Sequence, residues 1–179
     1  MRREDLLHLV EEISKVRKLD SLIIVGSISV LGVMADHAIP DGMLVSNEVD
    51  AYPESDPPAA FEIAKTFGQG SVFEQRYGYY FDPISPDLPT LPVGWKDRLL
   101  VHEMTNGVCL KFIDPNDAAI SKYARGEPKD LEWIAEGLRA SILSMATIRY
   151  RLRQTTFLND EEHERVKRQV EADAKRLGC

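Results

Sequence analysis

A short apolar segment that ends in a Gly-Ser step is the feature that most constrains the fold of this chain. Residues 22–25 are all aliphatic, and Gly26 and Ser27 follow directly. Such a run is typical of a buried strand, although an equally short run could lie inside a helix. The glycine break favours the strand. A strand that ends at Gly26-Ser27 offers backbone N–H groups to an anion such as a phosphate.

A second strand is predicted at residues 44–52, where polar and apolar residues alternate. Side chains two positions apart share one face of a strand, so Ser46, Glu48 and Asp50 are expected to point the same way. Two carboxylates on one face can bind Mg²⁺. The plainer alternative is a row of solvated acids on a strand, and Gly-Ser steps are also common in ordinary turns.

Together these residues match what nucleotidyl transfer requires: a bound triphosphate, bound metal ions and an acceptor hydroxyl in line with the reacting phosphate. In this hypothesis Glu48 and Asp50 bind Mg²⁺, and one of two such ions could activate the attacking oxygen. Lys122 and Lys129 are candidates for stabilising negative charge. The candidate nucleotide-binding residues are Gly26, Ser27, Ser46 and Lys129.

Hydrophobic periodicity and turn residues predict an α/β (α+β) fold: a short mixed sheet flanked by helices, with C-terminal helices packed against it. Residues 1–140 are expected to form the main domain and residues 141–179 a helical segment packed on it. The predicted strands are 21–25, 44–52, 77–81, 98–104 and 107–113. The predicted helices are 5–18, 27–35, 57–67, 118–124, one that begins at 128, and 160–177.

The Gly-Ser step and the acid-apolar-acid strand resemble nucleotidyltransferases of the DNA polymerase β superfamily, particularly the AbiEii-like branch. Residues 91–99, 117–122 and 126–132 also look like segments of these relatives. The resemblance covers roughly the first 140 residues. It implies that Lys122 and Asp130 belong to the active site, so that Asp50, Lys122 and Asp130 are its expected catalytic residues.

The chain departs from the pattern of these relatives at three points. Glu48 stands where aspartate is usual, and Glu127 stands where arginine is frequent, with Arg125 close enough to substitute for it. The third carboxylate of the superfamily has no clear match. The alternatives for it are Asp82, Glu103 and Asp114.

The resemblance implies Mg²⁺-dependent transfer of a nucleoside monophosphate from a nucleoside triphosphate to an RNA (the 3′ end of a tRNA) or to a protein side chain. It also implies a toxin–antitoxin or phage-defence setting, with a cognate toxin or antitoxin chain as a further partner. Two alternatives stay open. One is a catalytically inactive, antitoxin-like partner that keeps the fold. The other is a small-molecule nucleotidyltransferase, because an acidic surface suits a cationic acceptor.

The net charge of −7 argues against tight, non-specific binding of nucleic acid but leaves room for a local basic groove. Residues 149–153 are the best candidate for such a groove. The favoured alternative is a helix face whose arginines pair with acids such as those at 160–162.

Two cysteines are too few for a disulfide framework, and no export signal or apolar stretch of about 20 residues is present. We therefore expect a cytoplasmic protein with no membrane partner. The oligomeric state stays open.

Overall fold

A mixed β-sheet lies at the centre of the chain. The structure is a computed structural model that describes residues 1–33, 35 and 38–178. Within them the sheet has five strands in the order β3-β2-β1-β5-β4. The central strand β1 pairs antiparallel with β2 and parallel with β5, which confirms the predicted mixed sheet. The strands are β1 (Ser21–Ile24), β2 (Glu48–Pro53), β3 (Tyr80–Pro83), β4 (Leu100–Glu103) and β5 (Cys109–Phe112).

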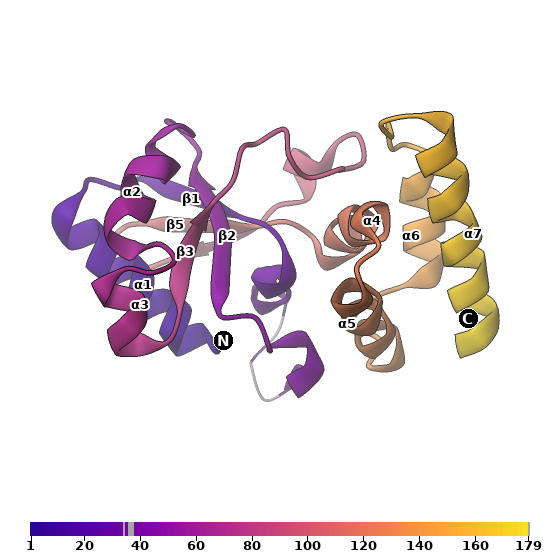
Figure 1. Cartoon of the computed structure of the whole chain (residues 1–179), viewed down its shortest axis with the longest axis horizontal. Helices are drawn as coiled ribbons and strands as arrows, with labels where there is room; N and C mark the ends of the chain where they lie inside the picture. Colours follow the sequence, from indigo (N-terminus) through magenta and orange to yellow (C-terminus); the bar gives the residue numbers. More distant parts are fainter. Residues whose placement is uncertain (34, 36–37, 179) are drawn as a thin grey trace.

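The helices form two groups, one at each end of the molecule, with the sheet between them (Figure 1). The first group contains α1 (Arg3–Val16), α2 (Ala59–Phe67) and α3 (Val72–Tyr77). The second contains α4 (Pro115–Arg125), α5 (Pro128–Arg139), α6 (Met145–Leu152) and α7 (Asp160–Leu177). The predicted C-terminal helices are therefore present and pack on the rest of the chain.

Helix α7 begins and ends where its sequence signals place it. The Asn159 side chain accepts a hydrogen bond from the backbone of Glu162, and Gly178 ends the helix in the left-handed conformation at φ +70°. Val166, Val170 and Ala174 form an apolar stripe and are fully buried. The stripe therefore packs inside this chain.

Several predicted elements differ from those in the structure. The predicted helix at 27–35 is a short 3₁₀ helix, η1 (Ser27–Gly32), and position 34 of the prediction lies outside the described residues. The predicted strand at 77–81 begins only at Tyr80. Tyr77 instead closes α3, a helix that was not predicted. Ser71 caps this helix, and Gly78 stops it at φ +81°.

The basic stretch at 149–153 lies on α6 and is largely neutralised by acids. Arg151 donates to Asp114 and Asp117, at 2.7 and 2.9 Å, and Arg149 pairs with Glu171 on α7. The alternative of arginines paired with acids is confirmed, although these acids are not those at 160–162. In the part of the chain that the structure describes, no helix combines the length and apolar character needed to span a bilayer.

Candidate active site

The turn after β1 brings the chain into direct contact with β2. Gly26 adopts φ +66°, and the neighbouring Val25 N–H donates to the carbonyl oxygen of Asp50 at 2.9 Å. A Cβ atom on Gly26 would lie only 1.9 Å from Asp50 Oδ2. Glycine is required here both by the backbone conformation and by this close approach. The predicted pairing of the Gly-Ser turn with the acidic strand is therefore physically present.

Three carboxylates gather on adjacent strands β2 and β3. Asp82 is the register partner of Asp50 across the parallel pair, and Glu48 accepts a hydrogen bond from the Tyr80 hydroxyl at 3.0 Å. Burial, followed by the charges of Glu48 and Asp82, raises the pKa of Asp50 to about 7. Burial and Glu48 also raise the pKa of Asp82. Such mutual repulsion marks a site that a cation would stabilise.

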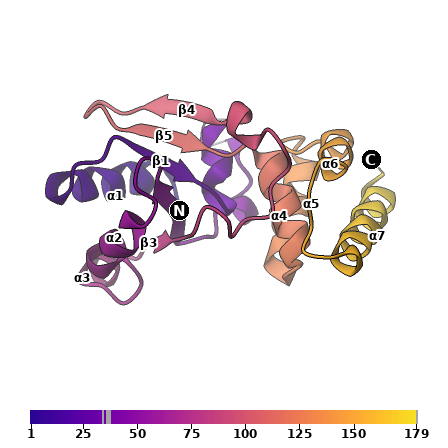
Figure 2. The same cartoon turned by 90° about the horizontal axis from the view of Figure 1, so that it is seen from above.

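Of the three alternatives for a third carboxylate, only Asp82 lies beside Asp50. Glu103 ends β4 at the opposite edge of the sheet, as Figure 2 shows from above. Asp114 caps helix α4 and accepts a hydrogen bond from Arg151. The pairing of β2 with β3 determines which acid lies beside Asp50, and the register of this pairing cannot be read from the sequence.

The carboxylates do not form a closed metal cage. Among the residues that the structure describes, no group of three His, Cys, Asp or Glu side chains is arranged to hold a metal ion. Mg²⁺ commonly binds through one or two carboxylates and completes its shell with water and substrate phosphates. Glu48 and Asp50 would supply only part of such a shell, and the remaining ligands would have to come from outside the protein.

A buried ionic network joins the Gly-Ser turn to helices α4 and α5. Lys122 Nζ donates to Ser27 Oγ and to Asp130 Oδ1, each at 2.9 Å. Arg125 holds the same carboxylate through Nε at 2.6 Å and through its terminal nitrogen at 2.5 Å. Lys122 and Asp130, which the sequence motif alone had placed in the site, are thus brought to Ser27.

Burial and hydrogen bonding have opposite effects on the pKa values of this network. It lowers the pKa of Lys122, although Asp130 opposes the shift. Burial also pushes the pKa of Asp130 upward, but the hydrogen bonds from Arg125 and Lys122 outweigh it and hold that pKa below its usual value. Asp130 is therefore the anion that keeps two cations next to the turn.

Arg125 brings a guanidinium group to Asp130, although position 127, where the related sequences often carry arginine, holds glutamate. Glu127 is an exposed residue that precedes α5 as its N-cap. The Arg125 side chain is half-exposed, and the charges of Asp50 and Glu48 contribute to its raised pKa after that of Asp130. A guanidinium group is thus present at the site.

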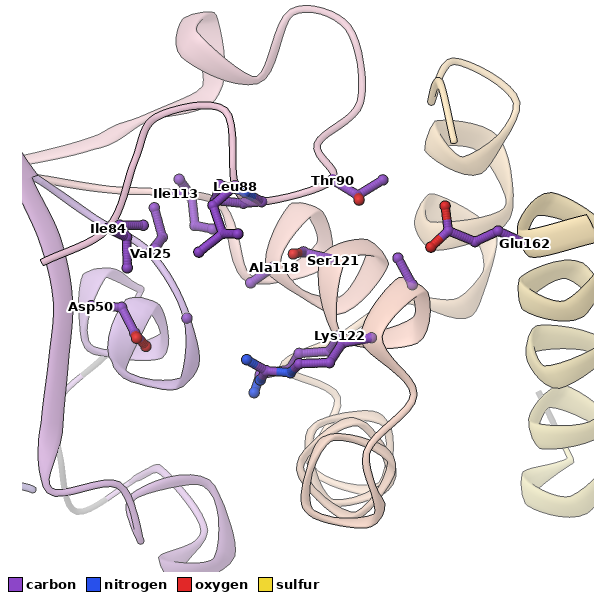
Figure 3. Close-up of a pocket in the computed structure, with 14 residues that line it drawn as sticks. Val25, Asp50, Ile84, Leu88, Thr90, Ile113, Ala118, Ser121, Lys122 and Glu162 are labelled. Atoms are coloured by element: carbon purple, nitrogen blue, oxygen red, sulfur yellow. The ribbon is translucent and has the colours of Figure 1, made fainter. Parts of the chain in front are cut away.

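A cavity of about 300 Å³, here called the apolar cavity, opens beside Asp50. Its lining is partly aliphatic and partly polar, and Asp50 and Lys122 face each other across it (Figure 3). The other polar lining residues are Thr90, Ser121, Arg125 and Glu162. Leu88 and Thr90 come from the loop that follows β3, a segment with no motif in the sequence. The aliphatic wall consists of Val25, Ile84, Leu88, Ile113 and Ala118.

A second cavity of about 190 Å³, here called the lysine cavity, borders Ser27 and Glu48. Lys129 is exposed at this cavity, with Nζ 3.9 Å from Glu48 Oε1. Ser46 precedes β2 instead of lying on its face, so that part of the prediction is wrong. The Ser46 hydroxyl lies 3.3 Å from both the carbonyl oxygen of Glu48, to which it can donate, and the N–H of Glu48, from which it can accept. The lining residues are Ser27, Gly42, Val45, Ser46, Asn47, Glu48, Lys129 and Trp133.

The sequence analysis assigns Trp133 no role in the site. The residue is buried, and Lys122 Nζ lies 4.9 Å from the centre of its ring. Its position in the first half of α5, three residues after Asp130, is the signal that could have placed it near Lys122.

Comparison with known proteins yields one family. A family model described as "Nucleotidyltransferase of unknown function (DUF6036)" matches residues 4–176. The match extends through α6 and α7 and so includes the tail beyond residue 140. No curated protein and no solved structure matches the chain.

Proposed function

The chain belongs to this family of nucleotidyltransferases, and we propose that it transfers a nucleoside monophosphate, with Mg²⁺, from a nucleoside triphosphate to an acceptor hydroxyl. One observation carries the proposal: the Gly26-Ser27 turn, the Asp50 carboxylate and the buried Lys122 meet at a single point. Nucleotidyl transfer requires anion binding, metal binding and charge stabilisation at one place.

Each residue has a role in this proposal. A Mg²⁺ ion held by Glu48 and Asp50 would neutralise phosphate charge. Ser27 and Lys129 contact the phosphates, and Lys122 keeps Ser27 in position through the hydrogen bond at 2.9 Å. Asp82, whose pKa burial raises, is placed beside Asp50 to accept the proton of the acceptor hydroxyl.

Charge favours a protein side chain as the acceptor over the 3′ end of a tRNA. The chain carries a net charge of −7, and both Arg149 and Arg151 already pair with acids. RNA binding depends largely on phosphate contacts with free Lys and Arg. Membership of the AbiEii-like branch, a toxin–antitoxin setting with a cognate chain, and a cytoplasmic location where nucleoside triphosphates are abundant belong to the same proposal.

The first experiment is calorimetric titration of the four nucleoside triphosphates with and without Mg²⁺. We expect Mg²⁺-dependent binding that Asp50→Asn abolishes and that Glu103→Gln, a matched change at the far edge of the sheet, leaves intact. Asp82→Asn should retain binding but lose transfer. Absence of binding by the folded wild-type protein would exclude the proposal.

A second experiment identifies the acceptor. The protein is incubated in a cell extract with a nucleoside triphosphate labelled at its α-phosphate, and the molecule that receives the label is determined. Label in protein that resists nuclease supports the favoured acceptor, and label in RNA identifies the tRNA alternative. Label on a purified small cationic metabolite would identify the small-molecule alternative. Mg²⁺-dependent binding without transfer to any acceptor would identify the inactive, antitoxin-like partner.

A further inference from the structure

Trp133 on α5 carries a buried polar atom that has no hydrogen-bond partner among the described residues. The side chain is 2% exposed, and its Nε1 is the one buried side-chain nitrogen or oxygen in those residues without a partner. An indole N–H can only donate. Buried donors are nearly always paired, so a missing partner calls for an acceptor from outside the protein.

The neighbours of Trp133 explain why the protein does not supply this acceptor. Lys122 lies over the face of the indole ring, 4.9 Å from its centre, whereas the N–H lies in the plane of the ring. Lys122 is itself a donor and is directed to Ser27 and Asp130. Trp133 also lines the lysine cavity, which is about 190 Å³ in volume.

The groups around the lysine cavity favour an acceptor-rich ligand. Ser27 Oγ accepts a hydrogen bond from Lys122, which leaves its own hydrogen free to donate outward. Lys129 adds an ammonium group at the edge of the cavity. Three kinds of donor, from Ser27, Lys129 and Trp133, suit the oxygens of a phosphate chain.

The apolar cavity offers a separate place for the rest of a nucleotide. Gly26 and Asp50 line the apolar cavity, whereas the adjacent Ser27 and Glu48 line the lysine cavity. The two cavities are therefore lined by successive residues of one turn and by two acids that lie two positions apart on β2. The aliphatic part of this cavity of about 300 Å³ suits a nucleoside, while Lys122 and Arg125 line its polar part.

We propose that the phosphate chain of the nucleoside triphosphate lies in the lysine cavity and that Trp133 Nε1 donates a hydrogen bond to one of its oxygens. This inference rests on the proposed function. It makes Trp133 a substrate-binding residue, in addition to its role in the packing of α5.

Nuclear magnetic resonance of ¹⁵N-labelled protein tests the hydrogen bond directly. The chain has two tryptophans, so Trp95→Phe leaves a single indole N–H signal that belongs to Trp133. Inorganic triphosphate with Mg²⁺ is the probe. We expect the Trp133 indole proton to shift downfield on addition of the probe, while the Trp95 signal of wild-type protein stays in place.

Trp133→Phe supplies the matched variant, because it keeps an aromatic ring under Lys122 and removes only the donor and part of the ring. Affinity for inorganic triphosphate should fall about 10- to 150-fold, as expected for one hydrogen bond to a charged acceptor. Trp95→Phe, the same change outside both cavities, should bind like the wild type. Binding of a nucleoside without phosphates should be unchanged in both variants, which a merely structural defect would not produce.

The outcomes separate this inference from the proposed function. A nucleotide that binds with Mg²⁺ and depends on Asp50, but leaves the Trp133 signal unmoved, overturns the inference and retains the function. A Trp133 signal that shifts with triphosphate in a protein without transfer activity supports the inference and not the function. If the Trp133 signal shifts with neither inorganic triphosphate nor a nucleotide, the missing partner is water, and the inference is overturned.

Discussion

At the scale of single residues, Gly26 and Asp50 determine the geometry of the site. The Gly26 Cα lies so close to the Asp50 carboxylate that no side chain fits between them. The same carboxylate stands beside Glu48 and Asp82, and burial adds to their repulsion. Gly26 thus provides the space for the carboxylate, and the negative charge of Asp50 is unfavourable without a cation.

Gly26→Ala should destabilise the protein and abolish nucleotide binding. The new Cβ would collide with Asp50, and the left-handed backbone is unfavourable for alanine, so the free energy of unfolding should fall by about 2 to 5 kcal/mol. Gly107→Ala is the control, since Gly107 has φ +83° with no atom within 4 Å of the added Cβ. Urea unfolding measures the loss of stability in both variants. The loss in Gly107→Ala comes from the backbone conformation alone, and the additional loss in Gly26→Ala comes from the collision with Asp50. Equal losses in the two would contradict the close approach.

Stability should fall as pH rises from about 4 to about 7. The pKa of Asp50 in the folded protein is about 7, above the ordinary value of 3.8, so the folded state binds more protons in this window. Asp50→Asn should flatten this part of the curve and raise stability above pH 7. Mg²⁺ should bind more tightly above pH 7, where the carboxylate is ionised. Unfolding of variant and wild type at pH 5, 6, 7 and 8, with and without Mg²⁺, checks both the stability and the Mg²⁺ binding. If the free energy of unfolding changes with pH to the same extent in the two proteins, the raised pKa does not belong to Asp50.

At the scale of elements, one carboxylate fastens α4 to α5 next to the turn after β1. Asp130 lies in the first turn of α5, where an anion is favoured by the helix dipole, and it binds Lys122 and Arg125 of α4. Lys122 extends the connection to Ser27. The helix pair is therefore tied to the Gly26-Ser27 turn after β1.

Asp130→Asn should lower the free energy of unfolding by about 3 to 5 kcal/mol, because Lys122 would be left buried without its counter-charge. Glu136→Gln on the same helix is the control. Its pair with Arg139 lies at the surface, so its loss should change stability by less than about 1 kcal/mol. Thermal and urea unfolding provide the measurement. A small effect at Asp130 would show that the network contributes little to stability.

At the scale of the whole molecule, the hydrophobic core runs without interruption from the first helix to the last. Buried side chains of α1, the sheet, α4 and α7 belong to one cluster, which includes Leu6, Ile24, Tyr123 and Val166. The boundary at residue 140 stays a prediction. A continuous core is typical of cooperative unfolding in one step.

Val166→Ala should shift a single unfolding transition, with a loss of about 1 to 3 kcal/mol, because the side chain is fully buried. Leu158→Ala is the control at a position that is 87% exposed, and it should have almost no effect. Calorimetry and circular dichroism should report the same midpoint. Two separate transitions, with only one affected by Val166→Ala, would mean that residues 141–179 unfold independently.

The local parts of this protein could be predicted from its sequence, because they depend on signals a few residues apart. The period of 3.6 residues and the Asn159 and Gly178 caps are enough to place α7. The Gly-Ser step after an apolar run is likewise local. In contrast, α3 is not predicted, since it is only six residues long and only Ser71 and Gly78 mark its ends.

The sequence by itself determined the class of fold, the Gly26-Ser27 turn, and the acids Glu48 and Asp50 at alternate positions. Only the tertiary structure decided that Asp82 is the carboxylate beside Asp50, that Lys122 reaches Ser27, and that the Trp133 N–H has no partner among the residues described. The physical reason is distance along the chain. Pairing between β2 and β3 and the packing of α4 on the turn join residues 32 and 95 positions apart, and no local preference encodes such contacts.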